Sequence, residues 1–192
     1  MHFIRRALPL AGLVGLVLML LTGSVFAQSR LVIASGTDAV TLDAHRITDS
    51  PSATVSEHIT ETLFELTPDG RIVPNLVESY EVSEDGRVWT LHLREGIRFH
   101  DGTPFNAAAV KYNLDRILDP ANAVTFRFLI SPVTSVDVVD EYTVRLTTAA
   151  PFAPILAHLT HSSIGMLSPA AVERYGQDIA RNPVGTGPFR FK

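Results

Sequence analysis

A change of hydrophobic period within residues 78–118 constrains the fold more than any other feature of this sequence. Apolar and polar residues alternate over residues 80–93, which is the pattern of half-buried strands, and Asp85-Gly86 suits a tight hairpin turn between them. Apolar residues then recur at the spacing of one helix face, from Asn106 as the expected N-cap to Pro120 as the stop. The stretch predicts a β-hairpin that leads into a capped helix, and hence a mixed α/β (α+β) fold.

The flanking sequence predicts shorter strands and helices. The wholly apolar run Leu31–Ala34 suits a strand buried on both faces, and apolar spacing predicts a helix over Thr54–Leu66. Phe126, Arg127 and Phe128 could form an exposed aromatic and basic patch, but the preferred interpretation is two core phenylalanines on either side of a solvated Arg127. Beyond them we expect two paired strands and two short helices, at residues 133–139, 142–146, 154–159 and 170–175.

The composition excludes several functional classes. The chain has no cysteine, so it has no disulfide framework, no thiolate metal site and no lipid-modified N-terminal cysteine. Its formal net charge of −4 is not the clustered basic charge that nucleic acid requires. The nucleophile-elbow, phosphate-loop and zinc-helix motifs are absent. We therefore expect no enzyme, no cofactor and no nucleic-acid partner.

The N-terminus has the pattern of an export signal. Arg5 and Arg6 precede an apolar run over residues 7–21, and Val25 and Ala27 fit a signal-peptidase site. The alternative is a retained membrane anchor, but the apolar run is roughly 15 residues and spanning a bilayer takes about 20. The sequence predicts cleavage after Ala27, a periplasmic location and no stable membrane insertion.

Many ordered motifs occur along the chain at matched spacing. They are Asn75–Tyr80, Ser83–Gly86, Trp89–Gly96, His100–Phe105 with Ala109-Val110, Leu42-Asp43 early in the chain, and Asn182–Phe189 late in it. Together these motifs resemble the peptide- and nickel-type family of extracytoplasmic solute-binding proteins, family 5, which are receptors of ABC importers. Residues 101–111, 157–158 and 168–171 are most similar to the glutathione- and dipeptide-binding branch.

The resemblance implies the N-terminal part of a two-lobed periplasmic-binding-protein type II fold with an inserted small α+β domain. It also implies hinge crossings near residues 63–74 and 182–187, with the second lobe missing. The implied divisions are a signal peptide at 1–27, the start of lobe one at 28–66, the inserted small domain at 67–182 and a truncated return to lobe one at 183–192.

The resemblance also implies a function. The protein would capture a peptide-like solute (a dipeptide, an oligopeptide or glutathione) in the periplasm and deliver it to a membrane permease, and we expect it to be a monomer. Three alternatives stay open: a receptor of the same family for a nickel chelate or another small solute, a secreted hydrolase, and a structural module without a ligand.

Four residues are the candidates for ligand binding. The resemblance places Thr37 and Asp38, in the loop after the first strand, and His161 and Ser162, after a short helix, at the wall of the cleft. The alternatives are that Asp38 only bonds its own turn and that Ser162 lies in an ordinary loop. His158 and His161 have a spacing that metals accept, but no acidic or cysteine partner is near, so we expect no metal site.

Two further motifs are interpreted as having a structural role and no role in binding or catalysis. Gly185–Pro188 is interpreted as a tight turn, at the place where the resemblance implies that the chain crosses between lobes. It is not interpreted as a phosphate-binding loop, because Pro188 has no donor amide and the lysine that such a loop requires does not follow. His100–Gly102 is interpreted as turn chemistry without a reaction, and Trp89 as a core anchor on its strand.

Overall fold

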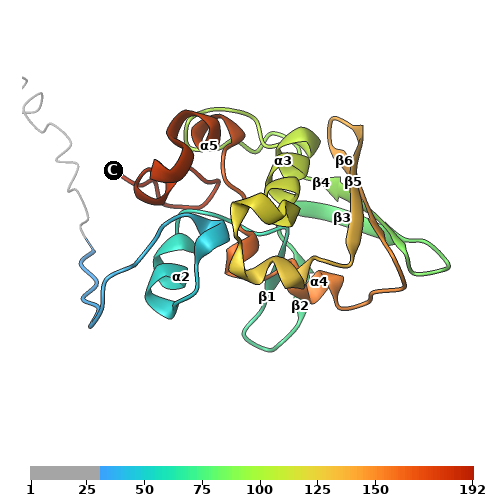
Figure 1. The fold of residues 1–192 in the computed structure, drawn as a ribbon, viewed down its shortest axis with the longest axis horizontal. Coiled ribbons are helices and arrows are strands. Elements are labelled where there is room, and N and C mark those ends of the chain that lie inside the picture. Colours follow the sequence, from blue (N-terminus) through green and yellow to red (C-terminus); the bar gives the residue numbers. More distant parts are fainter. Residues whose placement is uncertain (1–30) are drawn as a thin grey trace, which may run out of the picture. The chain divides into compact units, whose positions relative to one another are not determined.

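The computed structural model describes residues 31–192, of which residues 35–192 form one compact unit (Figure 1). The predicted signal peptide and its cleavage site lie outside the described residues. Within the described part, the helices are all too short or too polar to cross a membrane.

A four-stranded antiparallel sheet carries the core, with the strand order β3-β4-β6-β5. On β4 the side chains of Trp89, Leu91 and Leu93 are buried and those between them are half-buried, as the alternation predicts. The hairpin turn uses Gly86 at a φ of 66°. The predicted strands are therefore confirmed. Their bounds are Val77–Val82 for β3, Val88–Leu93 for β4, Val133–Asp140 for β5 and Thr143–Thr148 for β6.

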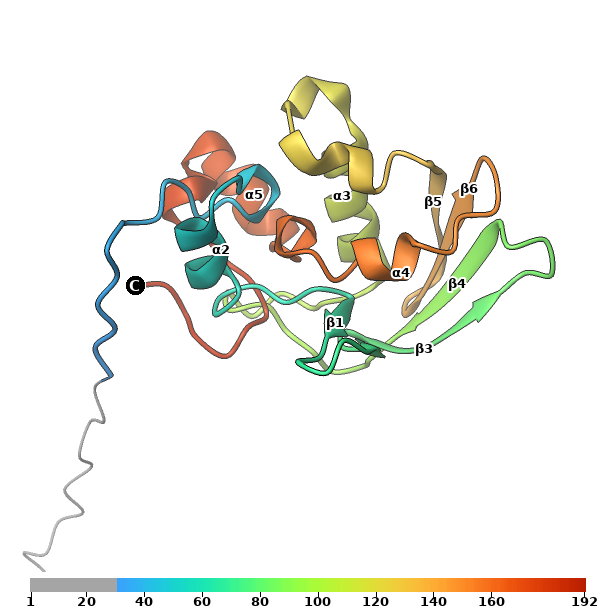
Figure 2. The same ribbon diagram turned by 90° about the horizontal axis from the view of Figure 1, so that it is seen from below.

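Helix α3 (Ala107–Leu118) packs against β5 and lies between the sheet and α5 in both ribbon views (Figure 1, Figure 2). It begins as predicted, because the Asn106 side chain accepts a hydrogen bond of 3.0 Å from the Ala109 amide. Its apolar stripe, Val110, Leu114 and Ile117, is buried in the main core. This stripe joins the helix to the sheet as the change of period predicts.

The remaining elements are short. The two short helices predicted late in the chain are confirmed as α4 and α5. A second, smaller apolar cluster is formed by Ala44, Ile47, Leu167, Ala171, Val172 and Ile179. The bounds of the short α-helices are Ser50–Ser56 for α2, Ile155–His158 for α4 and Pro169–Tyr175 for α5. Strands β1 (Phe64–Leu66) and β2 (Ile72–Pro74) pair with each other. The 3-10 helices are η1 (Ala44–Arg46), η2 (Pro120–Asn122), η3 (Thr125–Leu129), η4 (Ser162–Ile164) and η5 (Gly176–Arg181).

The predicted helix over Thr54–Leu66 is wrong. Helix α2 ends at Ser56, and the chain cannot continue as a helix from Thr62 onward, because the carbonyls that those turns would use have other partners. The carbonyl of His58 accepts from the Phe189 amide at 3.0 Å, and that of Ile59 accepts from the Gly187 amide at 2.9 Å. Contacts from the far end of the chain thus override the local apolar spacing.

The predicted buried strand at Leu31–Ala34 is also wrong for this structure. These residues have no regular secondary structure, and the side chains of Leu31, Val32 and Ile33 are 79%, 71% and 72% exposed. A two-sided buried strand needs neighbours on both edges and layers on both faces. None of the strand pairings within residues 31–192 involves this segment.

The chain crosses itself where Gly185 and Gly187 meet residues 58–60. Gly185 and Gly187 lie against the backbone of Ile59 with no room for a side chain, since an added Cβ at Gly185 would be 2.2 Å from the Ile59 carbonyl oxygen. His100 holds the crossing from the other side: its amide donates to the Gly185 carbonyl at 2.9 Å, and its Nε2 lies 2.7 Å from the Gly187 carbonyl. Thr186–Phe189 form a bend where the two segments meet, and the crossing of Gly185–Pro188 between lobes stays a prediction.

The segment His100–Gly102 does more than form a turn. Ser168 Oγ donates to Asp101 Oδ2 at 2.5 Å, and the Thr103 amide and hydroxyl donate to Asp101 Oδ1. Burial alone would raise the pKa of Asp101, but these hydrogen bonds outweigh burial and leave that pKa below its ordinary value. The ionised Asp101 thereby joins this loop to the start of α5.

Candidate ligand-binding surface

His161 and Ser162 lie at the start of η4, and the ring of His161 is held from one side. Its Nδ1 accepts from the Ser163 amide at 3.2 Å and lies 2.8 Å from the Ser163 hydroxyl, and Ser163 is fully buried. Burial lowers the pKa of His161, and the nearby His158 acts in the same direction. Within residues 31–192 no group bonds its Nε2, so His161 presents a neutral, oriented imidazole edge at neutral pH.

Two phenylalanine rings adjoin His161. The Phe126 ring centroid lies 4.7 Å from that of His161, at 41° between planes, and 5.9 Å from that of Phe128. The prediction that both rings are core residues is wrong, because Phe128 is 62% exposed and Phe126 is only half-buried. Val124 and Ile130 occupy the inward positions of this surface segment.

An acidic side chain completes the group, which we call the His161 surface: Glu57, Phe126, Phe128, His161 and Ser162. The negative charge of Glu57 lies close enough to raise the pKa of His161 against the stronger effect of burial. Aromatic and imidazole faces stack on flat amide or guanidinium groups, and a carboxylate binds an amino group. The surface therefore suits a small polar ligand with amide and amino groups.

A buried polar cluster lies beneath η4 and fixes its end. His45, fully buried, has its Nε2 at 3.0 Å from the carbonyl of Gly165, the residue that follows η4. Arg116 of α3 donates to Nδ1 of the same ring at 2.5 Å. The ring is therefore the neutral tautomer with its proton on Nε2. Burial, with the Arg116 charge, lowers the pKa of His45 to about 4.

Arg116 is itself held by Asp43. The two carboxylate oxygens of Asp43 accept from Nη1 at 3.0 Å and from Nη2 at 2.7 Å, and the Asp43 side chain is only 2% exposed. Burial would raise the pKa of Asp43, but the hydrogen bonds and the charge of Arg116 outweigh burial and lower it. Asp43, His45 and Arg116 thus tie the N-terminal segment to α3 and to the end of η4.

Thr37 and Asp38 lie in the exposed segment before α2. Both are exposed, and Asp38 accepts a hydrogen bond of 2.8 Å from the amide of Ala39, the next residue. No hydrogen bond joins either residue to His161 or Ser162 in residues 31–192. His161 and Ser162 are neighbours in the sequence, and the ligand-binding role of all four residues stays a prediction.

The sequence interpretation missed Glu57, and it considered an exposed patch at Phe126 but preferred a core position. Glu57 follows α2 and carries no motif, so only the fold places it near His161. The spacing Phe126-x-Phe128 was a usable signal, since two large apolar residues two apart in a 3-10 segment cannot both face one core. His158 Nδ1 lies 2.5 Å from the Leu129 carbonyl, and residues 31–192 contain no group of three or more histidine, cysteine or acidic side chains that could hold a metal ion.

The architecture is that of bacterial solute-binding proteins. The chain is similar to AgaA of A. tumefaciens R10, solved in complex with agropinic acid, with a TM-score of 0.76 and 36% identity over 81% of this chain and 31% of that chain. It is also similar to DppA of Helicobacter pylori, a periplasmic binding protein solved with the peptide STSA, with a TM-score of 0.75 and 30% identity over 82% of this chain and 35% of that chain.

The chain belongs to the bacterial extracellular solute-binding proteins of family 5, whose middle-region model matches residues 71–192. It is 42% identical over 188 residues to the glutathione-binding protein GsiB of Shigella dysenteriae serotype 1 and to that of Escherichia coli strain K12. Those matches cover 97% of this chain and 37% of the relatives' length. A family of binding proteins agrees with the expectation that the chain is not an enzyme.

Proposed function

We propose that the chain provides one wall of the ligand cleft in a periplasmic receptor of an ABC importer for a peptide-like solute. The observation that carries the proposal is the 42% identity to glutathione-binding GsiB, which extends over 97% of the chain. The ligand class is a dipeptide, an oligopeptide or glutathione, and the receptor passes it to a membrane permease. The protein acts as a monomer, exported with a signal peptide cleaved after Ala27.

The proposed architecture is two-lobed, with this chain as its N-terminal part. The start of lobe one, residues 28–66, precedes an inserted small domain, residues 67–182, and residues 183–192 return to lobe one. The crossing of Gly185–Gly187 over Ile59-Thr60 supports a boundary in this part of the chain. The smaller cluster includes Leu167 to Ile179, which favours a return to lobe one somewhat earlier than residue 183.

The His161 surface is the proposed contact with the ligand. Phe126 and His161 stack on peptide groups, the free Nε2 of His161 hydrogen-bonds a ligand carbonyl or carboxylate, and Glu57 binds an amino group. Thr37 and Asp38 bind from the loop before α2. Because a ligand drives closure by contacting both lobes only in the closed state, one wall alone binds weakly.

A chimera tests the proposal. Residues 28–192 replace the corresponding part of GsiB, and calorimetry measures binding of glutathione, a dipeptide and a nickel–histidine chelate. We expect micromolar or tighter binding of glutathione or the dipeptide, at least tenfold weaker binding in the Phe126→Ala chimera, and no effect of Phe152→Ala, another half-buried phenylalanine, outside the His161 surface. A chimera that melts cooperatively and binds only the chelate, or none of the three, rules the peptide-like ligand out.

A further inference from the structure

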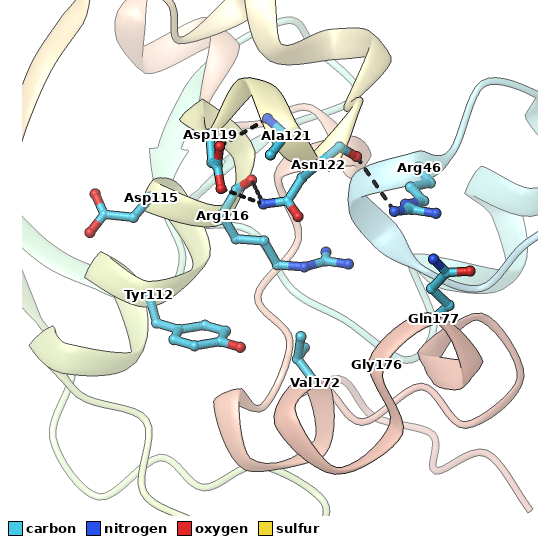
Figure 3. Close-up of a pocket in the computed structure, with 10 residues that line it drawn as sticks. All are labelled: Arg46, Tyr112, Asp115, Arg116, Asp119, Ala121, Asn122, Val172, Gly176 and Gln177. Atoms are coloured by element: carbon cyan, nitrogen blue, oxygen red, sulfur yellow. Dashed lines mark hydrogen bonds between the residues drawn. The ribbon is translucent and has the colours of Figure 1, made fainter.

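A second hollow in the molecule is not part of the His161 surface. It lies between α3, η2, α5 and η5, has a volume of about 610 Å³, and shares no residue with that surface. Figure 3 shows the Arg116 side chain extending across it, with the Tyr112 ring and Val172 on one side and Arg46 and Gln177 on the other. The pocket combines apolar walls with several hydrogen-bond donors.

Arg116 has one edge without a partner. Its Nη1 donates to Asp43 Oδ1 and His45 Nδ1, and its Nη2 donates once, to Asp43 Oδ2. The Nε–H and the second N–H of Nη2 remain, and these two bonds lie in the guanidinium plane and point the same way. No acceptor for them occurs within residues 31–192. This edge is a preformed fork of two parallel donors, held still by the buried Asp43 and His45.

The acidic residues around the pocket are already engaged. Asp115 pairs with Lys111 Nζ at 2.8 Å and points away from Arg116 in Figure 3. Asp119 accepts from the Ala121 amide at 2.9 Å and from Asn122 Nδ2 at 3.4 Å. Arg46, 43% exposed on the opposite wall, keeps most of its donors free, with a 3.5 Å hydrogen bond to the Asn122 carbonyl and a 3.6 Å contact to Asp43.

We propose that this pocket is a second binding site, which takes a small organic carboxylate. The two carboxylate oxygens bind the Nε and Nη2 edge of Arg116, Gln177 and Arg46 donate from the opposite wall, and the organic part lies against Val172 and the Tyr112 ring. A planar carboxylate matches the side-on fork of a guanidinium bidentately.

Charge favours a monoanion over a phosphate dianion at this site. Asp43 balances the charge of Arg116, so Arg46 is the cation left for a ligand. Glu173 lies near Tyr112, where its negative charge adds to burial in raising the pKa of the Tyr112 hydroxyl. A second negative charge on the ligand would gain little and would be repelled by Glu173 and Asp119.

The test is a titration of the full chain, labelled with 15N in arginine, at constant ionic strength. Acetate, benzoate and inorganic phosphate are added separately, and the Nε–H resonance of Arg116, assigned by its loss in Arg116→Lys, is followed. We expect a saturable shift with millimolar or tighter affinity for benzoate, weaker binding of acetate and the weakest of phosphate. Gln177→Glu places a carboxylate on the exposed wall and should weaken benzoate binding at least tenfold.

Ser79→Glu is the matched control, since Ser79 is exposed on β3 and the same charge is added away from the pocket. Benzoate binding should be unchanged in this variant. The proposal is overturned if the Arg116 resonance does not saturate with any of the three anions, if phosphate binds most tightly, or if both variants weaken binding equally.

Discussion

The carbonyl oxygen of Ile59 lies 2.2 Å from the position that a Cβ atom on Gly185 would occupy. Gly187 meets the same backbone, with its would-be Cβ 2.8 Å from the Ile59 oxygen. Neither glycine has a positive φ, so close approach of two backbones is what requires glycine here, rather than a left-handed conformation. The contact holds residues 58–60 and residues 185–189 together.

Gly185→Ala should therefore destabilise the protein strongly. The added methyl group forces the crossing apart and breaks the hydrogen bond from Gly187 to Ile59, so we expect a loss of about 3 kcal/mol in the free energy of unfolding. Urea unfolding followed by Trp89, the single tryptophan, measures it. Gly36→Ala is the control, because Gly36 has no atom within 4 Å of its would-be Cβ; a loss as large in that variant would contradict the explanation.

Arg116→Met should cost about 3–5 kcal/mol of stability, because it leaves the buried carboxylate of Asp43 without its counter-charge. Adding Asp43→Asn should recover part of that loss, since the asparagine keeps the N-cap of η1 and removes the stranded charge. Urea midpoints of the single and double variants measure the two effects.

The exposed pair of Arg71 and Asp69, at 2.7 Å, is the matched comparison. Arg71→Met should leave the urea midpoint unchanged, because exposed pairs contribute little. If the double variant Asp43→Asn/Arg116→Met is no more stable than Arg116→Met alone, the buried charge is not the cause of the loss.

His45 should make stability depend on pH between about 4 and 6.5. Its folded pKa is about 4 and its ordinary value is 6.5, so the unfolded chain binds the proton more readily in this window. The free energy of unfolding should thus be constant above neutral pH with respect to His45 and fall by about 3 kcal/mol as pH drops to 4. His161, whose pKa burial also lowers, adds a loss of the same sign.

Urea unfolding of wild type and His45→Gln at pH 7, 5.5 and 4.5 checks this. The variant should show a smaller pH dependence than wild type, whereas His58→Gln, which removes an exposed histidine, should keep the full dependence. Equal pH dependence in wild type and His45→Gln would show that other groups determine the acid response.

The sequence predicted those elements that depend on neighbouring residues. The hairpin at Gly86 and the helix from Asn106 follow from local turn chemistry, alternation and capping, which the structure preserves. The wrong predictions concern segments whose backbone conformation depends on contacts with residues far away in the sequence. The chain does not continue as a helix at Thr62 and Leu63, because Phe189 and Gly187 take the carbonyls of His58 and Ile59.

The candidate site, too, could be predicted from the sequence only in part. Family resemblance identified His161 and Ser162, but the partners of His161 come from residue 126 and residue 57, which no local pattern connects to it. The buried cluster of Asp43, His45 and Arg116 joins side chains more than 70 residues apart in sequence. Only the packing of α3 on the N-terminal segment brings those groups into contact.

Lys111→Ala should increase self-association of the protein. Strand β5 is an edge strand with Val138 and Val139 exposed, and Lys111 Nζ donates to its Val136 carbonyl at 2.7 Å, which blocks part of that edge. Because an unblocked edge pairs with other strands, sedimentation velocity should show more oligomer for Lys111→Ala than for wild type at equal concentration. The free energy of unfolding should change by less than about 1 kcal/mol. Arg87→Ala removes an exposed cation outside β5; if it associates as strongly, lost charge and not the freed edge is responsible.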